Sequence, residues 1–238
     1  MLGVERCQGC AVRHQAVCGA LTDTEISSLS MVARKRLVSA GEMILHAEDE
    51  ATFFANIVSG VVKLSKLLDD GRQQVVGLQF PPDFLGRPYR KRYPYFAEAA
   101  TDVELCVFPR AEFERLLDRE PALEKRMFQN TLDELDAARE WMLLLGRKTA
   151  AEKVATFLAL IARRNPRMAC AHMPAPDLIT MALPLPRADI ADYLGLTIET
   201  VSRQLSRLQA DGVIDVGSRR TIAVLKPDVL EDEARLSA

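Results

Sequence analysis

The sequence predicts an α+β protein in which an N-terminal antiparallel β-roll is followed by a long helix and a C-terminal winged helix-turn-helix. Short β-branched and aromatic runs between residues 37 and 108, a heptad-like apolar stripe after Pro121, and a helix–glycine–helix pattern before a hairpin lead to this prediction. We divide the chain into a cysteine-rich N-terminal segment (1–20), a β-roll domain (21–120), a long helix (121–146) and a winged helix-turn-helix domain (147–238).

The composition limits the classes of protein that this chain can represent. Its 238 residues carry a net charge of −2 and five cysteines, an odd number that disfavours a closed disulfide framework. No apolar run has the length of a secretory signal or of a membrane span. We therefore expect a cytoplasmic protein with no membrane partner, whose thiols stay reduced and whose nucleic-acid surface, if it has one, is a local patch.

The N-terminal segment concentrates thiols. Cys7, Cys10 and Cys18 follow the spacing C-x2-C-x7-C within twelve residues. Clustered cysteines in a reducing compartment bind metal more often than they bind each other. His14 lies between two of them and is expected to be solvated.

The β-roll is predicted from strands separated by turn residues. The Asp70-Gly71 pair between two apolar stretches is a strong hairpin signal, and Gly60 and Gly77 divide the neighbouring runs. Near Pro109 the periodicity changes, and residues 110–120 are predicted to form a short helix.

The long helix begins at Pro121, a residue that suits the first turn of a helix, and ends near Gly146. Its apolar positions alternate in spacings of three and four, and they favour either packing within its own domain or a dimer interface. Because the stripe spans fewer than three heptads, a dimer formed by it alone would be weak. The stripe consists of Phe128, Thr131, Leu135, Ala138, Met142 and Leu145.

A helix-turn-helix is the most specific pattern in the chain. Residues 187–195 read as a first helix that ends at Gly195, which can adopt the left-handed conformation. Thr197 can cap a second helix, on which Val201, Leu205 and Leu208 form the buried stripe. The preceding stretch, residues 165–181, is rich in Pro and Ala and is interpreted as an excursion; its lone Cys170 is interpreted as a structural or free thiol.

The opposite face of the second helix carries candidate DNA contacts near its N-terminal end. Glu199, Ser202 and Arg203 share one face, where Arg203 can donate two hydrogen bonds to guanine and Glu199 can accept one from cytosine. The Glu and Arg could equally form an exposed ion pair, but the frame of Gly195, the apolar stripes and the hairpin favours DNA recognition. The further DNA-binding candidates are Thr197, Arg207 and the two hairpin arginines, interpreted as phosphate contacts, Arg219 and Arg220.

Taken over nearly its full length, the chain resembles the CRP/FNR family of bacterial transcription regulators. The order of roll, long helix and winged helix-turn-helix matches, and LGLTIETVSRQLSRLQADGVI is similar to the recognition region of the FNR subgroup. AREWMLLLGRK and the thiol-rich N-terminus look like FnrL-type oxygen-sensing members. The resemblance implies a roll of the cyclic-nucleotide-binding type and a homodimeric, non-enzymatic activator that works with RNA polymerase on double-stranded DNA.

The resemblance also implies a cofactor. FNR proteins hold an oxygen-labile [4Fe-4S] cluster, and Cys7, Cys10, Cys18 and Cys106 match its ligands. If residues 103–108 form a strand, Cys106 faces away from its apolar stripe, towards something laid over the sheet. The spacing alone would also suit a four-cysteine zinc site or a thiol–disulfide switch.

Further family properties are implied for the ligand and the operator. Relatives that bind cyclic nucleotides carry Gly-Glu and a later Arg in the roll, whereas here Arg87 follows Gly86 and Phe96 stands in place of the Arg; no cyclic nucleotide is expected. The FNR resemblance implies a half-site close to TTGAT with its inverted copy four base pairs away. Ala138 departs from the acidic residue of well-known FNR proteins, so loss of the cluster could either separate the subunits or reorient the DNA-binding domains of a stable dimer.

Overall fold

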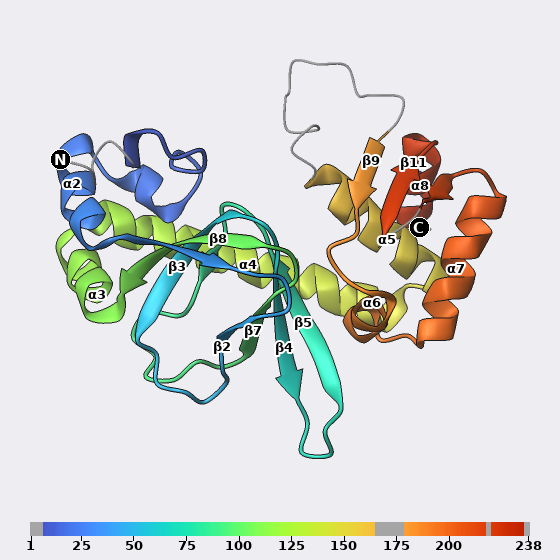
Figure 1. The fold of residues 1–238 in the computed structure, drawn as a ribbon, viewed down its shortest axis with the longest axis horizontal. Coiled ribbons are helices and arrows are strands. Elements are labelled where there is room, and N and C mark those ends of the chain that lie inside the picture. Colours follow the sequence, from blue (N-terminus) through green and yellow to red (C-terminus); the bar gives the residue numbers. More distant parts are fainter. Residues whose placement is uncertain (1–6, 165–178, 218–219, 236–238) are drawn as a thin grey trace. The chain divides into compact units, whose positions relative to one another are not determined.

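The computed structural model describes residues 7–164, 179–217 and 220–235 and confirms the predicted α+β architecture (Figure 1). The chain forms two compact units, residues 1–136 and 137–238. The elements of the first unit begin with a 3-10 helix and a short α-helix, which the sequence reading did not anticipate. They are η1 (Val17–Ala20), α2 (Asp23–Val32), β1 (Arg34–Val38), β2 (Met43–Leu45), β3 (Phe53–Ser59), β4 (Val62–Leu67), β5 (Gln73–Gln79), β6 (Phe84–Leu85), β7 (Phe96–Ala99), β8 (Val103–Pro109), α3 (Arg110–Arg119) and the start of α4 (Pro121–Arg147).

Two four-stranded antiparallel sheets make up the roll, with strand orders β1-β8-β3-β6 and β2-β7-β4-β5. Alternating side chains of the strands fill the space between the sheets, and this inner core includes Ile57, Leu64 and Leu105. The predicted hairpin joins β4 and β5, and Gly71 there has a φ of 84°, a left-handed conformation that glycine adopts without strain.

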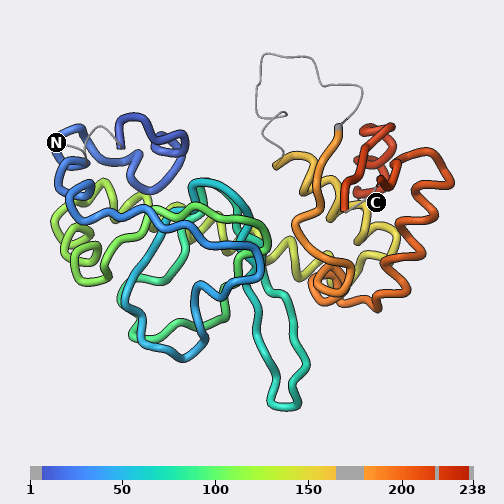
Figure 2. Tube along the Cα trace, in the orientation of Figure 1, coloured from blue at the N-terminus to red at the C-terminus, as the bar shows by residue number. Residues whose placement is uncertain are grey.

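A second apolar cluster lies on the outer side of the β1-β8-β3-β6 sheet. It joins the N-terminal segment through Val17 and Leu21, α3 through Phe113, and the first turns of α4 through Leu123. Figure 2 shows the N-terminal segment folding back beside α3. This cluster is the physical reason that residues before the roll are ordered against it, because burying these side chains offsets the entropy of fixing the segment.

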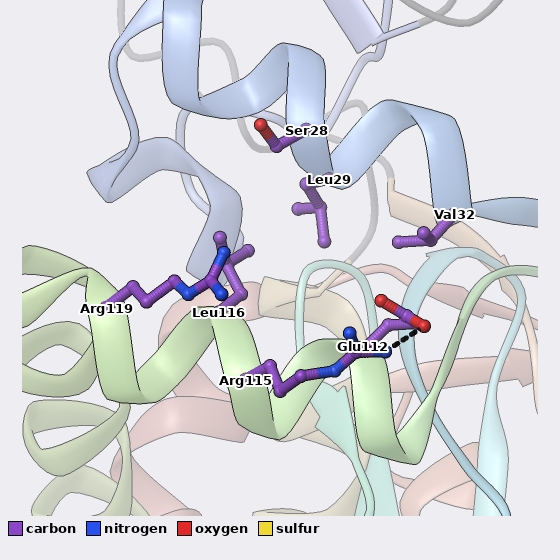
Figure 3. Close-up of a pocket in the computed structure, with 7 residues that line it drawn as sticks. All are labelled: Ser28, Leu29, Val32, Glu112, Arg115, Leu116 and Arg119. Atoms are coloured by element: carbon purple, nitrogen blue, oxygen red, sulfur yellow. Dashed lines mark hydrogen bonds and ion pairs between the residues drawn. The ribbon is translucent and has the colours of Figure 1, made fainter.

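Helix α2 is held against α3 at the edge of this second cluster. A capping box between Thr22 and Glu25 starts the helix, and Leu29 is buried on its inner face. Figure 3 shows a small pocket between the two helices, where Leu29 faces Leu116 and where Glu112 and Arg115 of α3 form an ion pair. The end of the cysteine-rich segment therefore continues directly into a helix with a fixed position in the first unit.

The second unit contains the end of α4 and the predicted helix-turn-helix. Its other elements are α5 (Ala150–Arg163), β9 (Ile179–Ala182), α6 (Arg187–Leu194), α7 (Ile198–Ala210), β10 (Ile214–Val216), β11 (Thr221–Val224) and α8 (Pro227–Ala234). The predicted hairpin is confirmed as β10 and β11, which form a three-stranded sheet of order β10-β11-β9.

Two features of the second unit differ from the sequence reading. The supposed excursion at 165–181 ends in a strand, because residues 179–182 pair with β11 and complete the wing sheet. We expected the domain boundary near Gly146, whereas the two compact units divide between Asp136 and Ala137. The reason is packing: the Trp141 ring stacks on Tyr193 of α6 with centroids 3.9 Å apart, and Leu144 is buried, so the last turns of α4 belong with the DNA-binding unit.

Candidate cysteine cluster and DNA-binding helix

The cysteine-rich segment is a series of tight turns. The amide of Cys10 donates to the carbonyl of Cys7 at 3.4 Å, and the amide of Arg13 donates to the carbonyl of Cys10 at 3.2 Å. Val17, which is buried in the outer cluster, fixes the turn that precedes Cys18. Turns of this kind bring cysteines that are separated in sequence to the same end of a short loop.

Strand β8 presents the fourth cysteine to this segment. Val103 and Leu105 point into the core of the roll, whereas Cys106 and Phe108 contact the outer cluster. The alternation predicted for this strand is therefore confirmed, and the material laid over the sheet is the N-terminal segment itself. Cys7, Cys18 and Cys106 all pack against the outer cluster and are half-buried.

A buried asparagine joins two of these cysteines and was missed by sequence reasoning. Asn56 on β3 is the antiparallel partner of Cys106, so their side chains share one face of the sheet. Its Nδ2 atom donates to the Cys18 sulfur at 3.8 Å, and its Oδ1 atom is buried without a partner in the described residues. A polar residue inside an otherwise apolar strand, in register with a cysteine, is the signal that could have identified it.

The electrostatics of the site are those of thiols held close together. The pKa of the Cys18 thiol is raised to about 11, mainly by burial and also by the neighbouring Cys10 and Cys7 sulfurs, whereas Arg13 acts in the opposite direction. In the described part of the chain no group of three or more His, Cys, Asp or Glu side chains has metal-binding geometry. Cys7, Cys18 and Cys106 nevertheless pack on one apolar cluster, and cysteine thiolates are ligands that a metal group takes with loss of their protons.

The second candidate site is the helix-turn-helix, whose local geometry matches the prediction. Gly195 ends α6 with a φ of 61°, and the Thr197 side chain caps α7 by accepting from the amide of Thr200 at 3.2 Å. Val201, Leu205 and Leu208 are buried beneath α7 as predicted. The helix therefore presents its other face, at a fixed angle, to solvent.

Glu199 and Arg203 are exposed on that face, and Ser202 lies between them. Backbone hydrogen bonding at the helix N-terminus and the Thr197 hydroxyl lower the pKa of Glu199, so its carboxylate is an acceptor at neutral pH. Arg187 of α6, which was not singled out from the sequence, donates to the Ser202 hydroxyl at 3.0 Å. These groups have the donor and acceptor types that base edges in the major groove require.

The remaining predicted DNA contacts lie in different surroundings. Arg207 forms ion pairs with Asp211 and with Glu233 of α8, which gives it an intramolecular role that the sequence did not suggest. Arg220 is exposed beside β11 with a φ of 67°. Arg219 and Cys170 lie outside the residues that the structure describes.

The apolar stripe of α4 is largely exposed to solvent in a single chain. Phe128 is 63% exposed, Leu135 45% and Met142 72%, and Thr131 and Ala138 are exposed as well. Leu145, the last residue predicted for the stripe, is half-buried and lies close to Gly195 in the helix-turn-helix. An exposed row of large apolar side chains on one helix is typical of an interaction surface.

Fold and site together define a DNA-binding regulator with an N-terminal β-roll domain. Residues 35–120 match the model of the cyclic nucleotide-binding domain, and residues 152–233 match that of the Crp-like helix-turn-helix domain. The chain belongs to the CRP/FNR family of transcription regulators and is of the FNR/FixK type. It is a DNA-binding regulator and not an enzyme.

Individual relatives support this assignment over nearly the full length. A probable transcriptional activator of Rhizobium leguminosarum bv. viciae is 48% identical, with 98% of this chain and 93% of the relative covered. The transcriptional activator protein FnrL of Cereibacter sphaeroides is 45% identical, with 97% and 92% covered. The structure of FixK2 from Bradyrhizobium japonicum superposes with a TM-score of 0.76 at 34% identity, with 87% of this chain and 100% of that chain covered.

Two further predictions concern a membrane span and a cyclic nucleotide. Within the described ranges, no helix unites the length and the apolarity needed to cross a bilayer. The expectation that no cyclic nucleotide binds stays a prediction: Arg87 follows Gly86 and is exposed, and Phe96 is half-buried in β7.

Proposed function

We propose that this chain is an oxygen-responsive transcriptional activator that binds DNA when Cys7, Cys10, Cys18 and Cys106 hold a [4Fe-4S] cluster. One observation carries the proposal: Cys106 lies in the last strand of the roll, yet it packs against the same apolar cluster as Cys7 and Cys18. Cys10 is included as a ligand because it follows Cys7 in the same turn, where its amide donates to the Cys7 carbonyl. Four thiolates are the ligand set that a cubane cluster needs.

In this proposal the protein residues hold the N-terminal segment in place, and the cluster makes that attachment sensitive to oxygen. When bound, an iron–sulfur cluster adds a link between the N-terminal segment and β8 that oxygen destroys. Val17 and Leu21 hold the segment on the outer cluster, and Leu123 extends that cluster into α4. A change in the position of the N-terminal segment would therefore act close to α4, the helix that carries the exposed apolar stripe.

The exposed stripe of α4 supports a homodimer as the DNA-binding form. Pairing of Phe128, Leu135 and Met142 between two chains would remove large apolar side chains from water. Two recognition helices would then meet successive major grooves about 34 Å apart on a palindromic operator. We propose TTGAT-N4-ATCAA-like sites, with RNA polymerase as the partner that the activator serves.

The alternative is a regulator of the same fold with a zinc ion or a thiol–disulfide switch in place of iron. Four cysteine sulfurs in tetrahedral arrangement also form structural zinc sites. The two proposals differ in their metal content and in their response to air, so a single preparation distinguishes them.

The test is anaerobic purification of the full chain, followed by iron and sulfide analysis and DNA binding before and after exposure to air. We expect about four iron and four sulfide per chain, a brown colour that fades in air, and operator binding that weakens with it. The Cys106→Ser variant should lose the iron, whereas Cys170→Ser, a matched control, should keep it. Stoichiometric zinc, or operator binding indifferent to air in an iron-loaded protein, would overturn the proposal.

A further inference from the structure

We infer that Arg126 is a positioning residue that connects the cysteine-rich segment to α4. The inference rests on the proposed function and deepens it, because it identifies the contact through which the state of the segment reaches the helix with the exposed apolar stripe. Arg126 lies in the second turn of α4, between Leu123 and Met127.

The connection is a hydrogen bond from a charged side chain to the backbone of the cysteine-rich segment. The Nη2 atom of Arg126 donates to the carbonyl oxygen of Gln15 at 2.6 Å. Gln15 lies between Cys10 and Cys18, in a turn that its own amide closes by donating to the carbonyl of Val12 at 3.1 Å. Because the acceptor is a main-chain atom, the contact reports where this turn lies, whatever side chains it carries.

The surroundings of Arg126 make this contact its principal anchor in the described residues. The Nε atom of Arg126 is buried and has no partner there. Leu123 and Met127, one turn apart on the same side of α4, pack on the apolar cluster that also contacts Cys18 and Cys106. The guanidinium thus lies near this cluster. Its hydrogen-bond acceptor, the Gln15 carbonyl, belongs to the segment that carries three of the cysteines.

The same helix carries the proposed dimer surface a short distance further along. Phe128 follows Arg126 by two residues and is exposed on a different side of α4, and Leu135 continues the stripe. A helix transmits displacement along its axis because its hydrogen-bonded turns are stiff. Movement of the turn around Gln15 therefore acts on the start of α4 through Arg126, and through α4 on the stripe.

The first test uses the full-length protein without any cluster and measures amide hydrogen exchange. Arg126→Met keeps the apolar stem and removes the donor, and it should speed exchange of amides in residues 12–18 about tenfold. Arg126→Lys retains a donor and should restore most of the protection. Lys125→Met removes a charge from the adjacent, exposed position and should leave the exchange unchanged. Wild-type exchange in Arg126→Met, or equal effects in Lys125→Met, would contradict the inference.

The second test measures whether the state of the cysteine-rich segment changes the dynamics of α4, and not only whether the segment is stable. Exchange in residues 128–142 is compared between anaerobic and air-treated protein, for the wild type and for Arg126→Met at matched iron content. We expect the difference between the two states to shrink several-fold in the variant, while its iron content before air exposure is unchanged. An undiminished difference would overturn the inference. If the wild type holds no iron, the proposed function fails, and the first test decides the Arg126 contact alone.

Discussion

We predict that the sequence preference of α7 is set by three residues, Glu199, Ser202 and Arg203. Arg203 is exposed on α7, where a guanidinium can donate two hydrogen bonds to guanine. Ser202 accepts a hydrogen bond from Arg187, which leaves its hydroxyl proton available to an acceptor on DNA. Arg203 and Ser202 are therefore expected to make different contacts, and their substitutions should have different effects on sequence preference.

Replacement of Arg203 by Ala should cost about 1–3 kcal/mol at the guanine of the half-site and relax discrimination there. The physical reason is the loss of a bidentate donor that only guanine matches. Selection of binding sites from a random library measures the preference at each base. Gln209→Ala, an exposed change at the other end of α7, is the control, and an unaltered preference in Arg203→Ala would reject the assignment.

At the scale of elements, α8 holds the recognition helix in place. Glu233 of α8 pairs with Arg207 of α7, and Glu231 accepts from the Nε atom of Arg163 on α5 at 2.9 Å. The Lys148 ammonium, just after α4, donates to the carbonyl of Ala234 at the end of α8. These contacts tie α5, α7 and the start of the DNA-binding domain to one C-terminal helix.

Arg207→Ala should therefore act on stability more than on phosphate binding. Loss of its partly exposed ion pairs should cost about 0.5–1 kcal/mol and lower the melting temperature by roughly 2–4 °C. The slope of log affinity against log salt should stay as in the wild type, and Glu233→Gln should reproduce the loss of stability. A slope that falls by about one without destabilisation would instead identify Arg207 as a phosphate contact.

Helix α4 supports a prediction about assembly. Leu135→Glu places a like charge from each subunit in the proposed interface, and dimerisation should weaken by about 2 kcal/mol or more, roughly thirtyfold. Sedimentation of anaerobic protein over a range of concentrations measures the dissociation constant. Gln129→Glu adds the same charge off the stripe and should leave the dimer intact. If Leu135→Glu sediments as the wild type does, another surface forms the dimer.

For the whole molecule, the proposed function assigns sensing to one unit and DNA recognition to the other. The four predicted cluster ligands belong to residues 1–136, and α7, which is predicted to read the bases, belongs to residues 137–238. Cys106→Ser should therefore lower operator affinity under anaerobic conditions while the preferred sequence stays the same. Site selection at raised protein concentration checks this expectation. A changed base preference would show that the roll also shapes the recognition helix.

Several local signals were sufficient to predict elements from the sequence. The Asp70-Gly71 hairpin, the Gly195 turn and the Thr197 cap are confirmed, because each depends on the conformational preferences of a few adjacent residues. The capping box at Thr22 and Glu25 was equally readable, yet α2 was not predicted, since its apolar positions are few.

The sequence by itself determined the order of roll, long helix and winged helix-turn-helix, together with the face of α7 that meets solvent. Those features follow from periodicity and turn chemistry, which act over a few residues. Only the tertiary structure decided that Cys106 meets the N-terminal segment beside Asn56, that Arg126 reaches Gln15, and that Arg207 is paired with Glu233. These contacts join residues far apart in the chain, and their partners are set by how the elements pack, which no local pattern encodes.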